Sequence, residues 1–205
     1  STALFANSTH ASIGNKRTLC VFDLVGANGD FYGIMKDFKT AALGWGVDIE
    51  LKPYTDEKIA ALRTSGITAM AMNMTANFAV LSKVENMFGA VVKRIDTWDA
   101  IVRKHSDVFA KVTNAADLDA VKRAGRVGFI YCFQMSAPFG WDLEKLQTFI
   151  DRGVRQIQLA DGNRNFLVDS CWEPTNAGLS QYGYRVIEAF NDHGVIIDLS
   201  HVGDR

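Results

Sequence analysis

One arrangement of hydrophobic and polar positions recurs four times along the chain: an amphipathic segment, a glycine, and a short apolar run. The amphipathic segments fall at 55–65, 114–124, 142–152 and 180–193, and the apolar runs follow at 67–72, 127–133, 154–160 and 195–200. Apolar positions three and four residues apart predict helices, and unbroken apolar runs predict strands that are covered on both faces. A further apolar run at 19–25 predicts a strand that opens the series.

A longer helical pattern lies between the second and third apolar runs. From Phe78 to about His105, apolar residues recur three and four positions apart, which predicts one long helix. The earlier stretch 26–54 holds several glycines and Pro53 without a clear period. We therefore expect an inserted loop there rather than a further domain.

Five strands that alternate with helices predict a parallel α/β architecture. Two forms remain open at this point, an open doubly wound sheet and part of a (β/α)8 barrel of the TIM-barrel type. A complete barrel takes about 250 residues, whereas this chain has 205. For the barrel we expect about the first five βα units, in a single domain 1–205 that is incomplete at its C-terminal end.

Composition narrows the functional classes. The chain is 48% hydrophobic and 22% charged with a net charge of −1, which is typical of a globular protein without a basic surface for nucleic acid. No apolar run approaches the roughly 20 residues of a membrane span. The polar start of the chain lacks the features of an intact signal peptide, so we expect a cytoplasmic protein, with a periplasmic or secreted one after signal cleavage as the alternative. Three scattered cysteines argue against a disulfide framework.

Polar residues stand where the predicted strands end, which is where α/β proteins of both forms keep their chemistry. These residues are Asn73, Gln134, Asp161 and His201. His201 and Asp161 could bind one metal ion or act as a base and its orienting partner, or they could simply cap strand ends. Gln134 carries no charge, so it is better suited to holding a carbonyl group or water than to binding a metal.

Other residues have both a functional and a structural interpretation. Cys132 shares a strand face with Gln134 and is either a nucleophile or, as we favour, a buried inert thiol. Four aromatic residues form either a substrate wall or, as we favour, part of the core: Tyr131, Phe133, Phe139 and Trp141. No pattern of the phosphate-binding, serine-hydrolase or zinc-helix type occurs in the sequence.

Four stretches near the C-terminal end resemble the membrane (renal) dipeptidase family of zinc peptidases. They are Gly153–Leu159, Asp169–Pro174, Gly178–Gly183 and Gly194–Val202, and weaker similarity extends back to Asp23. The resemblance implies a (β/α)8 barrel with two zinc ions at the strand ends. It also implies hydrolysis of dipeptides, including some with a D-residue in the second position.

The resemblance can be carried over residue by residue. His201 matches the histidine that the family has after its fifth strand, and the histidine after the fourth strand falls at Asp161. The glutamate that bridges the two metals falls at Gln134. The first-strand motif Asp-Gly-His-Asn-Asp falls on 23–27, where Val25 and Ala27 replace both ligands. Two neighbouring zinc ions need anionic ligands to offset their repulsion, so the resemblance together with these changes implies an altered or absent two-zinc centre.

The sequence thus favours a dipeptidase-like hydrolase that acts on a dipeptide or small amide through Gln134, Asp161 and His201. Zinc is the cofactor that the resemblance implies, with His201 and Asp161 as the remaining candidate ligands. The alternative is a catalytically degenerate relative that binds a small molecule or a protein partner, and a structural role for a half-barrel is a third interpretation. Because the first and last predicted strands leave unpaired edges, we also expect a homo-oligomer or a complementing C-terminal segment.

Overall fold

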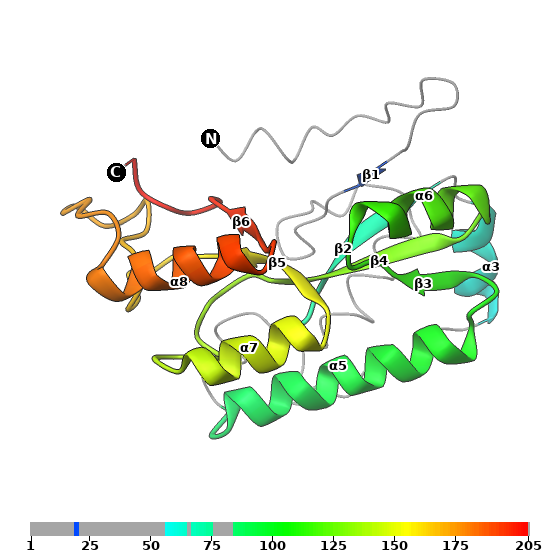
Figure 1. Cartoon of the computed structure of the whole chain (residues 1–205), viewed down its shortest axis with the longest axis horizontal. Helices are drawn as coiled ribbons and strands as arrows, with labels where there is room; N and C mark the ends of the chain where they lie inside the picture. Colours follow the sequence, from blue (N-terminus) through cyan, green and yellow to red (C-terminus); the bar gives the residue numbers. More distant parts are fainter. Residues whose placement is uncertain (1–18, 21–55, 65–66, 76–83, 205) are drawn as a thin grey trace.

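The computed structural model describes residues 19–20, 56–64, 67–75 and 84–204, and it contains a parallel sheet flanked by helices (Figure 1). The elements are β1 (Leu19–Cys20), α3 (Asp56–Thr64), β2 (Ala69–Asn73), α5 (Met87–Lys104), β3 (Phe109–Lys111), α6 (Ala115–Arg123), β4 (Val127–Phe133), α7 (Leu143–Asp151), β5 (Val154–Gln158), α8 (Gln181–Asp192) and β6 (Ile196–Asp198). The strand order is β1-β2-β4-β5-β6, and β3 also pairs with β4. The predicted α/β class and about five βα units are therefore confirmed.

Strand β3 is the element that the sequence analysis missed. It spans only Phe109–Lys111, which is too short to show an alternation of buried and exposed positions. Consequently the strand that carries His201 at its end is the sixth of the sheet and not the fifth. Of the predicted first strand only Leu19–Cys20 lies within the described residues, and 78–83 of the predicted long helix lie outside them.

Strand β4 is the centre of the sheet. One of its edges pairs with β2 from Gly128 to Cys132. The other edge is shared, because β3 pairs with its first residues, from Val127 to Phe129, and β5 with its last, from Tyr131 to Phe133.

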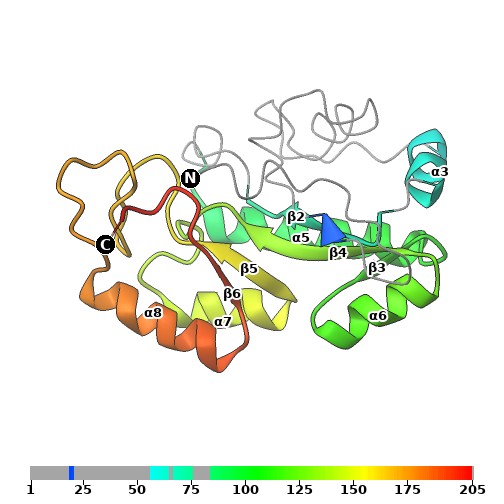
Figure 2. The ribbon, with the colours of Figure 1, turned by 90° about the horizontal axis from the view of Figure 1, so that it is seen from above.

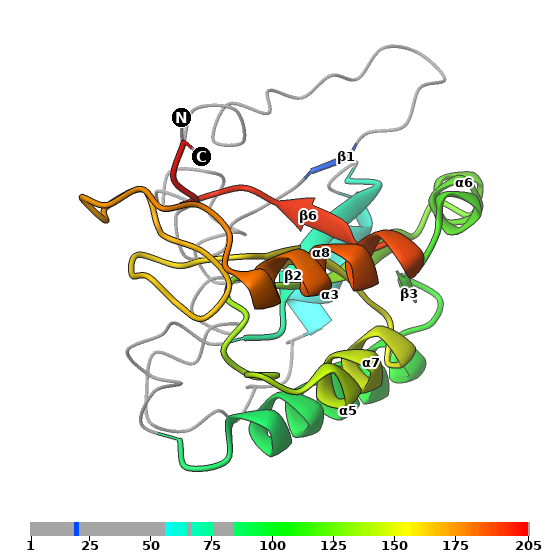
Figure 3. The ribbon, with the colours of Figure 1, turned by 60° about the vertical axis from the view of Figure 1, so that its left-hand side comes forward.

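The two faces of β4 are covered by different helices. On one face Phe129 lies edge-on to Trp98 of α5, with 5.6 Å between ring centroids, and Phe133 lies edge-on to Phe149 of α7 at 4.8 Å. Figure 3 shows α5 and α7 side by side there. On the opposite face Ile130 belongs to a smaller cluster with Val121 of α6. Aromatic burial of this kind supplies much of the stability of an α/β core.

A partly buried group of polar side chains joins β3, β4 and α5. The hydroxyl of Tyr131 donates to the carboxylate of Asp99 at 2.8 Å, and the ammonium of Lys111 lies 2.6 Å from the same carboxylate. Burial, followed by the negative charge of Asp99, raises the pKa of Tyr131 well above its usual range. The phenol therefore stays a hydrogen-bond donor, which fixes the short strand β3 to its neighbours.

Short side chains and glycines define the helix ends. Asn114 and Asp117 form a reciprocal capping box at the start of α6, and Asp142 accepts from two backbone N–H groups of α7. Gly153 has φ +91° immediately after α7, a backbone conformation that a side chain disfavours. The helix–glycine–strand unit read from the sequence is thus present where α7 meets β5.

The loops after the strands meet at the carboxyl edge of the sheet. The loop between β5 and α8, residues 159–180, lies beside the residues that follow β6, as Figure 2 shows, and Ser170 forms an antiparallel bridge with Val202. Among the described helices, none has the length and apolar character needed to cross a membrane.

Candidate functional site

The ends of β2 and β4 are joined by a buried network of neutral side chains. The Nδ2 group of Asn73 donates to Oε1 of Gln134 at 3.1 Å. The hydroxyl of Thr75 donates to Oδ1 of Asn73 at 2.7 Å and accepts from the backbone N–H of Gln134 at 3.1 Å. All three residues are buried, so this half of the edge is rigid and uncharged.

The orientation of the Gln134 amide follows from one backbone group. The N–H of Thr75 donates to a side-chain oxygen of Asn73 at 2.9 Å, and a backbone N–H can only be a donor. The atom of Asn73 that it contacts is therefore Oδ1, so the atom facing Gln134 is the Nδ2 donor. The atom of Gln134 that receives this bond must in turn be Oε1.

With its oxygen occupied, Gln134 has its Nε2 group left for other contacts. No residue in the described part of the chain accepts a hydrogen bond from this group, although the residue is only 6% exposed. An amide N–H₂ fixed in this way can donate to a carbonyl oxygen or to water. It cannot supply the negative oxygen that a bridging metal ligand requires.

The other half of the edge holds Asp161 after β5 and His201 after β6. Both side chains are partly exposed. The backbone carbonyl of His201 accepts from the N–H of Cys171 at 2.8 Å, and its ring lies edge-on to Trp172 with centroids 5.8 Å apart. Within the described residues no hydrogen bond joins Asp161 to His201, so their use as a pair stays a prediction.

A charged cluster fixes the loop that contains Asp161, residues 159–180. The carboxylate of Asp169 is bound by the guanidinium of Arg164, by the Thr175 hydroxyl at 2.7 Å and by the Ala177 N–H at 2.8 Å. The hydrogen bonds from Arg164, and then those from Ala177 and Thr175, hold the pKa of Asp169 well below its usual range. The loop thus depends on one ionised carboxylate.

A second polar contact ties the same loop to the ends of β4 and β5. Asn165 donates to the carbonyl of Leu159 at 2.6 Å and to the hydroxyl of Ser136 at 3.2 Å. Its own side-chain oxygen accepts from the N–H groups of Leu167 and Val168. The loop is therefore anchored to both strand ends, a role that periodicity in the sequence does not reveal.

The fit of the site to zinc can be judged from its donors. Among the described residues no three His, Cys, Asp or Glu side chains come together as metal ligands. The one oxygen of Gln134 already accepts from Asn73. Positions 23–27, where Val25 and Ala27 stand, lie outside the described residues. The described donors therefore do not fit a centre of two zinc ions.

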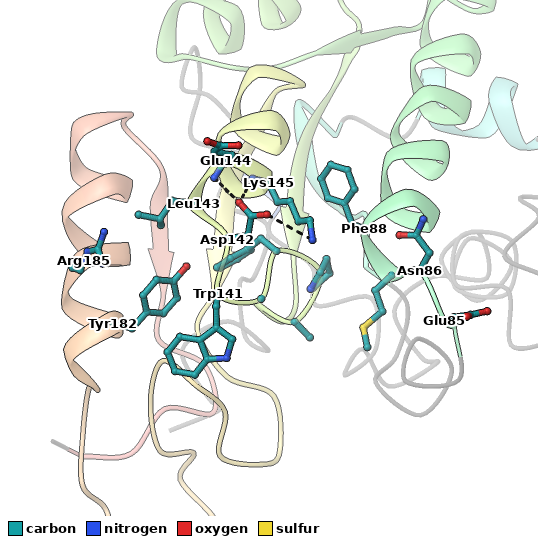
Figure 4. Close-up of a pocket in the computed structure, with 15 residues that line it drawn as sticks. Glu85, Asn86, Phe88, Trp141, Asp142, Leu143, Glu144, Lys145, Tyr182 and Arg185 are labelled. Carbon is teal, nitrogen blue, oxygen red and sulfur yellow. Dashed lines mark hydrogen bonds and ion pairs between the residues drawn. The ribbon is translucent and has the colours of Figure 1, made fainter.

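A separate groove of about 750 Å³ lies among the helix starts (Figure 4). It is lined by Glu85–Phe88 at the start of α5, by Ala137–Lys145, and by Tyr182 and Arg185 of α8. In Figure 4 the rings of Trp141 and Tyr182 lie close together, with centroids 4.9 Å apart. None of the strand-end candidates lines this groove.

The four aromatic residues that the sequence offered as a substrate wall differ in their burial. Tyr131, Phe133 and Phe139 are buried core residues, whereas Trp141 is 68% exposed and faces the groove. Cys132 is buried as well. The structure therefore places the first three in the core, although Phe139 also borders the groove, and leaves Trp141 as the exposed one of the four.

Taken together, the parallel sheet, its helices and the polar carboxyl edge define a partial α/β barrel of the TIM-barrel type. The chain matches the family described as membrane dipeptidase (peptidase family M19) over residues 24–205. It belongs to this family. The resemblance seen in the sequence is thereby confirmed.

The relatives agree with this membership over part of their length. Dipeptidase tcpJ of Claviceps purpurea is 30% identical over 115 residues, which are 55% of this chain and 27% of the relative. A solved amidohydrolase from Pseudomonas aeruginosa is 28% identical, with a TM-score of 0.65 over 74% of this chain and 44% of that one.

A solved metallo peptidase from Rhodobacter sphaeroides, bound to a phosphinate mimic of the dipeptide L-Ala-D-Ala, shares the fold. Its TM-score is 0.60 at 14% identity, and the match covers 82% of this chain and 55% of that one. The chain thus spans about half the length of these solved structures, and its match covers about a quarter of the curated relative.

Proposed function

We propose that the chain carries a dipeptidase-like hydrolytic site that acts on a dipeptide or small amide. The site lies at the carboxyl edge of the sheet and uses Gln134, Asp161 and His201. The observation that carries the proposal is the fixed amide of Gln134, whose Oε1 is held by Asn73 while Nε2 keeps its donors. Membership of the dipeptidase family supports the reaction class.

In this proposal the Nε2 group of Gln134 donates to the carbonyl oxygen of the scissile amide. Negative charge develops on that oxygen when water attacks the carbonyl carbon, so a donor fixed in advance stabilises the transition state more than the substrate. His201 takes the proton from the attacking water and passes it to the leaving amine, and Asp161 orients the imidazole.

Metal binding is the alternative use of the same two residues. Instead of acting as a base and its orienting partner, His201 and Asp161 are then the two candidate ligands for a single divalent ion such as zinc. No step is derived through this ion, because the described donors do not fit a two-zinc centre. Metal analysis of the purified chain by mass spectrometry tests this part, and two equivalents of tightly bound zinc per chain would contradict the altered centre.

A hydrolysis assay with a panel of dipeptides, including L-Ala-D-Ala, tests the reaction. We expect turnover by the chain and a loss of about 10²–10³ in kcat for Gln134→Met, which keeps the length of the side chain but removes the donor. Gln134→Asn, which shortens the reach of the amide, serves as the matched polar control. Absence of turnover for every dipeptide, with and without added divalent metal, would reject the hydrolase.

The alternative proposal is a relative that binds a small amide without hydrolysing it. The observation that favours it is the neutral network at Asn73, Thr75 and Gln134, which can recognise a carbonyl group but adds no charge. Binding of a dipeptide without turnover would select this alternative.

The proposed partner is a second copy or a complementing segment along β6. Ile196 in this strand and Leu199 directly after it are 57% and 67% exposed, whereas every residue of β2 and β4 is buried. In the described part of the sheet β6 pairs with β5 alone. Light scattering with size-exclusion chromatography tests this, and a stable monomer at high concentration would contradict a homo-oligomer.

A further inference from the structure

The side chain of Trp172 lies between the two strand ends that hold Asp161 and His201. A Cβ placed on Gly162, the neighbour of Asp161, would come within 2.3 Å of the indole carbon Cζ3. On its other side the indole meets the ring of His201 edge-on, with centroids 5.8 Å apart and an interplanar angle of 79°. One side chain therefore contacts both the segment after β5 and the residue after β6.

The backbone that carries Trp172 is held in place on both sides. Its own N–H donates to the hydroxyl of Ser170 at 3.2 Å, and that hydroxyl donates to the carbonyl of Gly162 at 3.0 Å. Ser170 also pairs with Val202 after β6. The indole is thus a rigid group on an anchored loop, which is the arrangement that binding sites require.

Burial in the core does not account for this residue. Trp172 is 70% exposed although it contacts Gly162 and His201, so most of the indole surface is open to a ligand. An exposed indole that is held by an anchored loop offers a ligand a large, rigid apolar contact area at low conformational cost.

We infer that Trp172 determines specificity by contacting a large apolar side chain of a dipeptide-like substrate bound at Asp161 and His201. This inference rests on the proposed function for the position of the substrate. An apolar or aromatic side chain stacks on the indole, whereas a glycine-type substrate leaves the indole in water. Trp172 contacts the ligand and takes no part in proton transfer.

The test uses two phosphinate dipeptide mimics, one with a benzyl side chain and one with hydrogen in its place, bound to the full chain at equilibrium. For Trp172→Ala we expect about tenfold weaker binding of the benzyl mimic, the upper range for one aromatic contact, and a change of less than about twofold for the other mimic. Trp172→Phe should retain the preference for the benzyl mimic. Trp141→Ala is the matched control, because Trp141 is similarly exposed at 68% but faces the separate groove.

The outcomes separate the role of Trp172 from the proposed hydrolase. Equal weakening of both mimics by Trp172→Ala, or no weakening of either, overturns the inference. A selective loss for the benzyl mimic in a chain that hydrolyses no dipeptide supports the inference and rejects the hydrolase. Turnover of a dipeptide without a selective loss for the benzyl mimic supports the hydrolase and overturns the role of Trp172. Failure of the unaltered chain to bind either mimic overturns both the hydrolase and the role of Trp172. The thermal unfolding midpoint of Trp172→Ala confirms that the variant is folded.

Discussion

The carboxyl edge of the sheet has two halves that are built in different ways. At β2 and β4, Asn73, Thr75 and Gln134 are neutral, buried and bonded to one another. At β5 and β6, Asp161 and His201 are partly exposed, and the nearby loop depends on the carboxylate of Asp169. The first half gains precision from burial, whereas the second keeps ionisable side chains at partly exposed positions.

The largest effect on this comparison is expected from Asn73→Asp. The new carboxylate can only accept hydrogen bonds, so it no longer donates to Oε1 of Gln134. The Gln134 amide should therefore turn and donate from its Nε2 group to that carboxylate instead of to a substrate. We expect about a 10²-fold lower kcat in the dipeptide assay, with the fold intact, as for loss of one carbonyl donor. Asn73→Ala leaves the amide free to choose its orientation and should lose less. Equal losses in the two variants would reject the role of amide orientation.

Thr75→Val tests the buried half without touching the proposed substrate contact. The variant removes the hydroxyl that accepts from the Gln134 N–H and keeps the side-chain shape. A buried group left without its partner costs about 1–3 kcal/mol, so the free energy of unfolding measured with urea should fall by that amount. A change below about 0.5 kcal/mol, the usual range for a surface position, would show that the network is not needed for stability.

Asp169→Asn tests the charged half. The amide cannot hold Arg164, Thr175 and the Ala177 N–H as the carboxylate does, so residues 159–180 should open locally. We expect about tenfold faster hydrogen exchange in this loop and unchanged exchange in β4. Asp151→Asn, at an exposed position in α7, is the matched control. Uniformly faster exchange would mean that the two halves are not independent.

The smallest effect is expected from lowering the pH, which weakens the loop held by Asp169. The pKa of Asp169 is lowered in the folded state, mainly by the hydrogen bond from Arg164. Its contribution to stability is therefore complete above the unfolded value of about 3.9 and declines as the pH falls below it towards the lower folded value. The protection factor of the loop amides, which corrects for the intrinsic slowing of exchange in acid, should begin to fall below about pH 4, while the neutral network stays protected. A loss of protection that starts at about pH 6, where histidine titrates, would implicate a different group.

The sequence predicted those parts of the fold that depend on local pattern. The helix–glycine–strand units of α7 with β5 and of α8 with β6 follow from apolar spacing and from Gly153 and Gly194. Strand β3 could not be predicted in the same way, because its three residues have no period of their own. It exists because the edge of β4 offers backbone partners that Val154 and the rest of β5 leave unused.

The sequence proposes the residues of the candidate site, but it does not indicate the contacts that hold them. Gln134 was expected to hold a carbonyl group because it is uncharged, yet its orientation depends on the backbone N–H of Thr75, which is far away in the sequence. Trp172 and Asp169 appeared only as part of a family motif, because one exposed aromatic and one paired acid carry no signal in isolation. Such contacts are tertiary and do not follow from spacing.

The shared edge of β4 also has a consequence for the order in which the chain folds. Phe129 pairs with Lys111 of β3, which lies 18 residues earlier in the sequence, whereas Gly128 pairs with Ala69 of β2, which lies 59 residues earlier. The longer loop costs about 1 kcal/mol more in closure entropy. We therefore expect β3, β4 and β5 to associate early, with β2 joining later. Asn73 reaches Gln134 only in that late step, so the amide that we place in the active site takes its orientation at the end of folding.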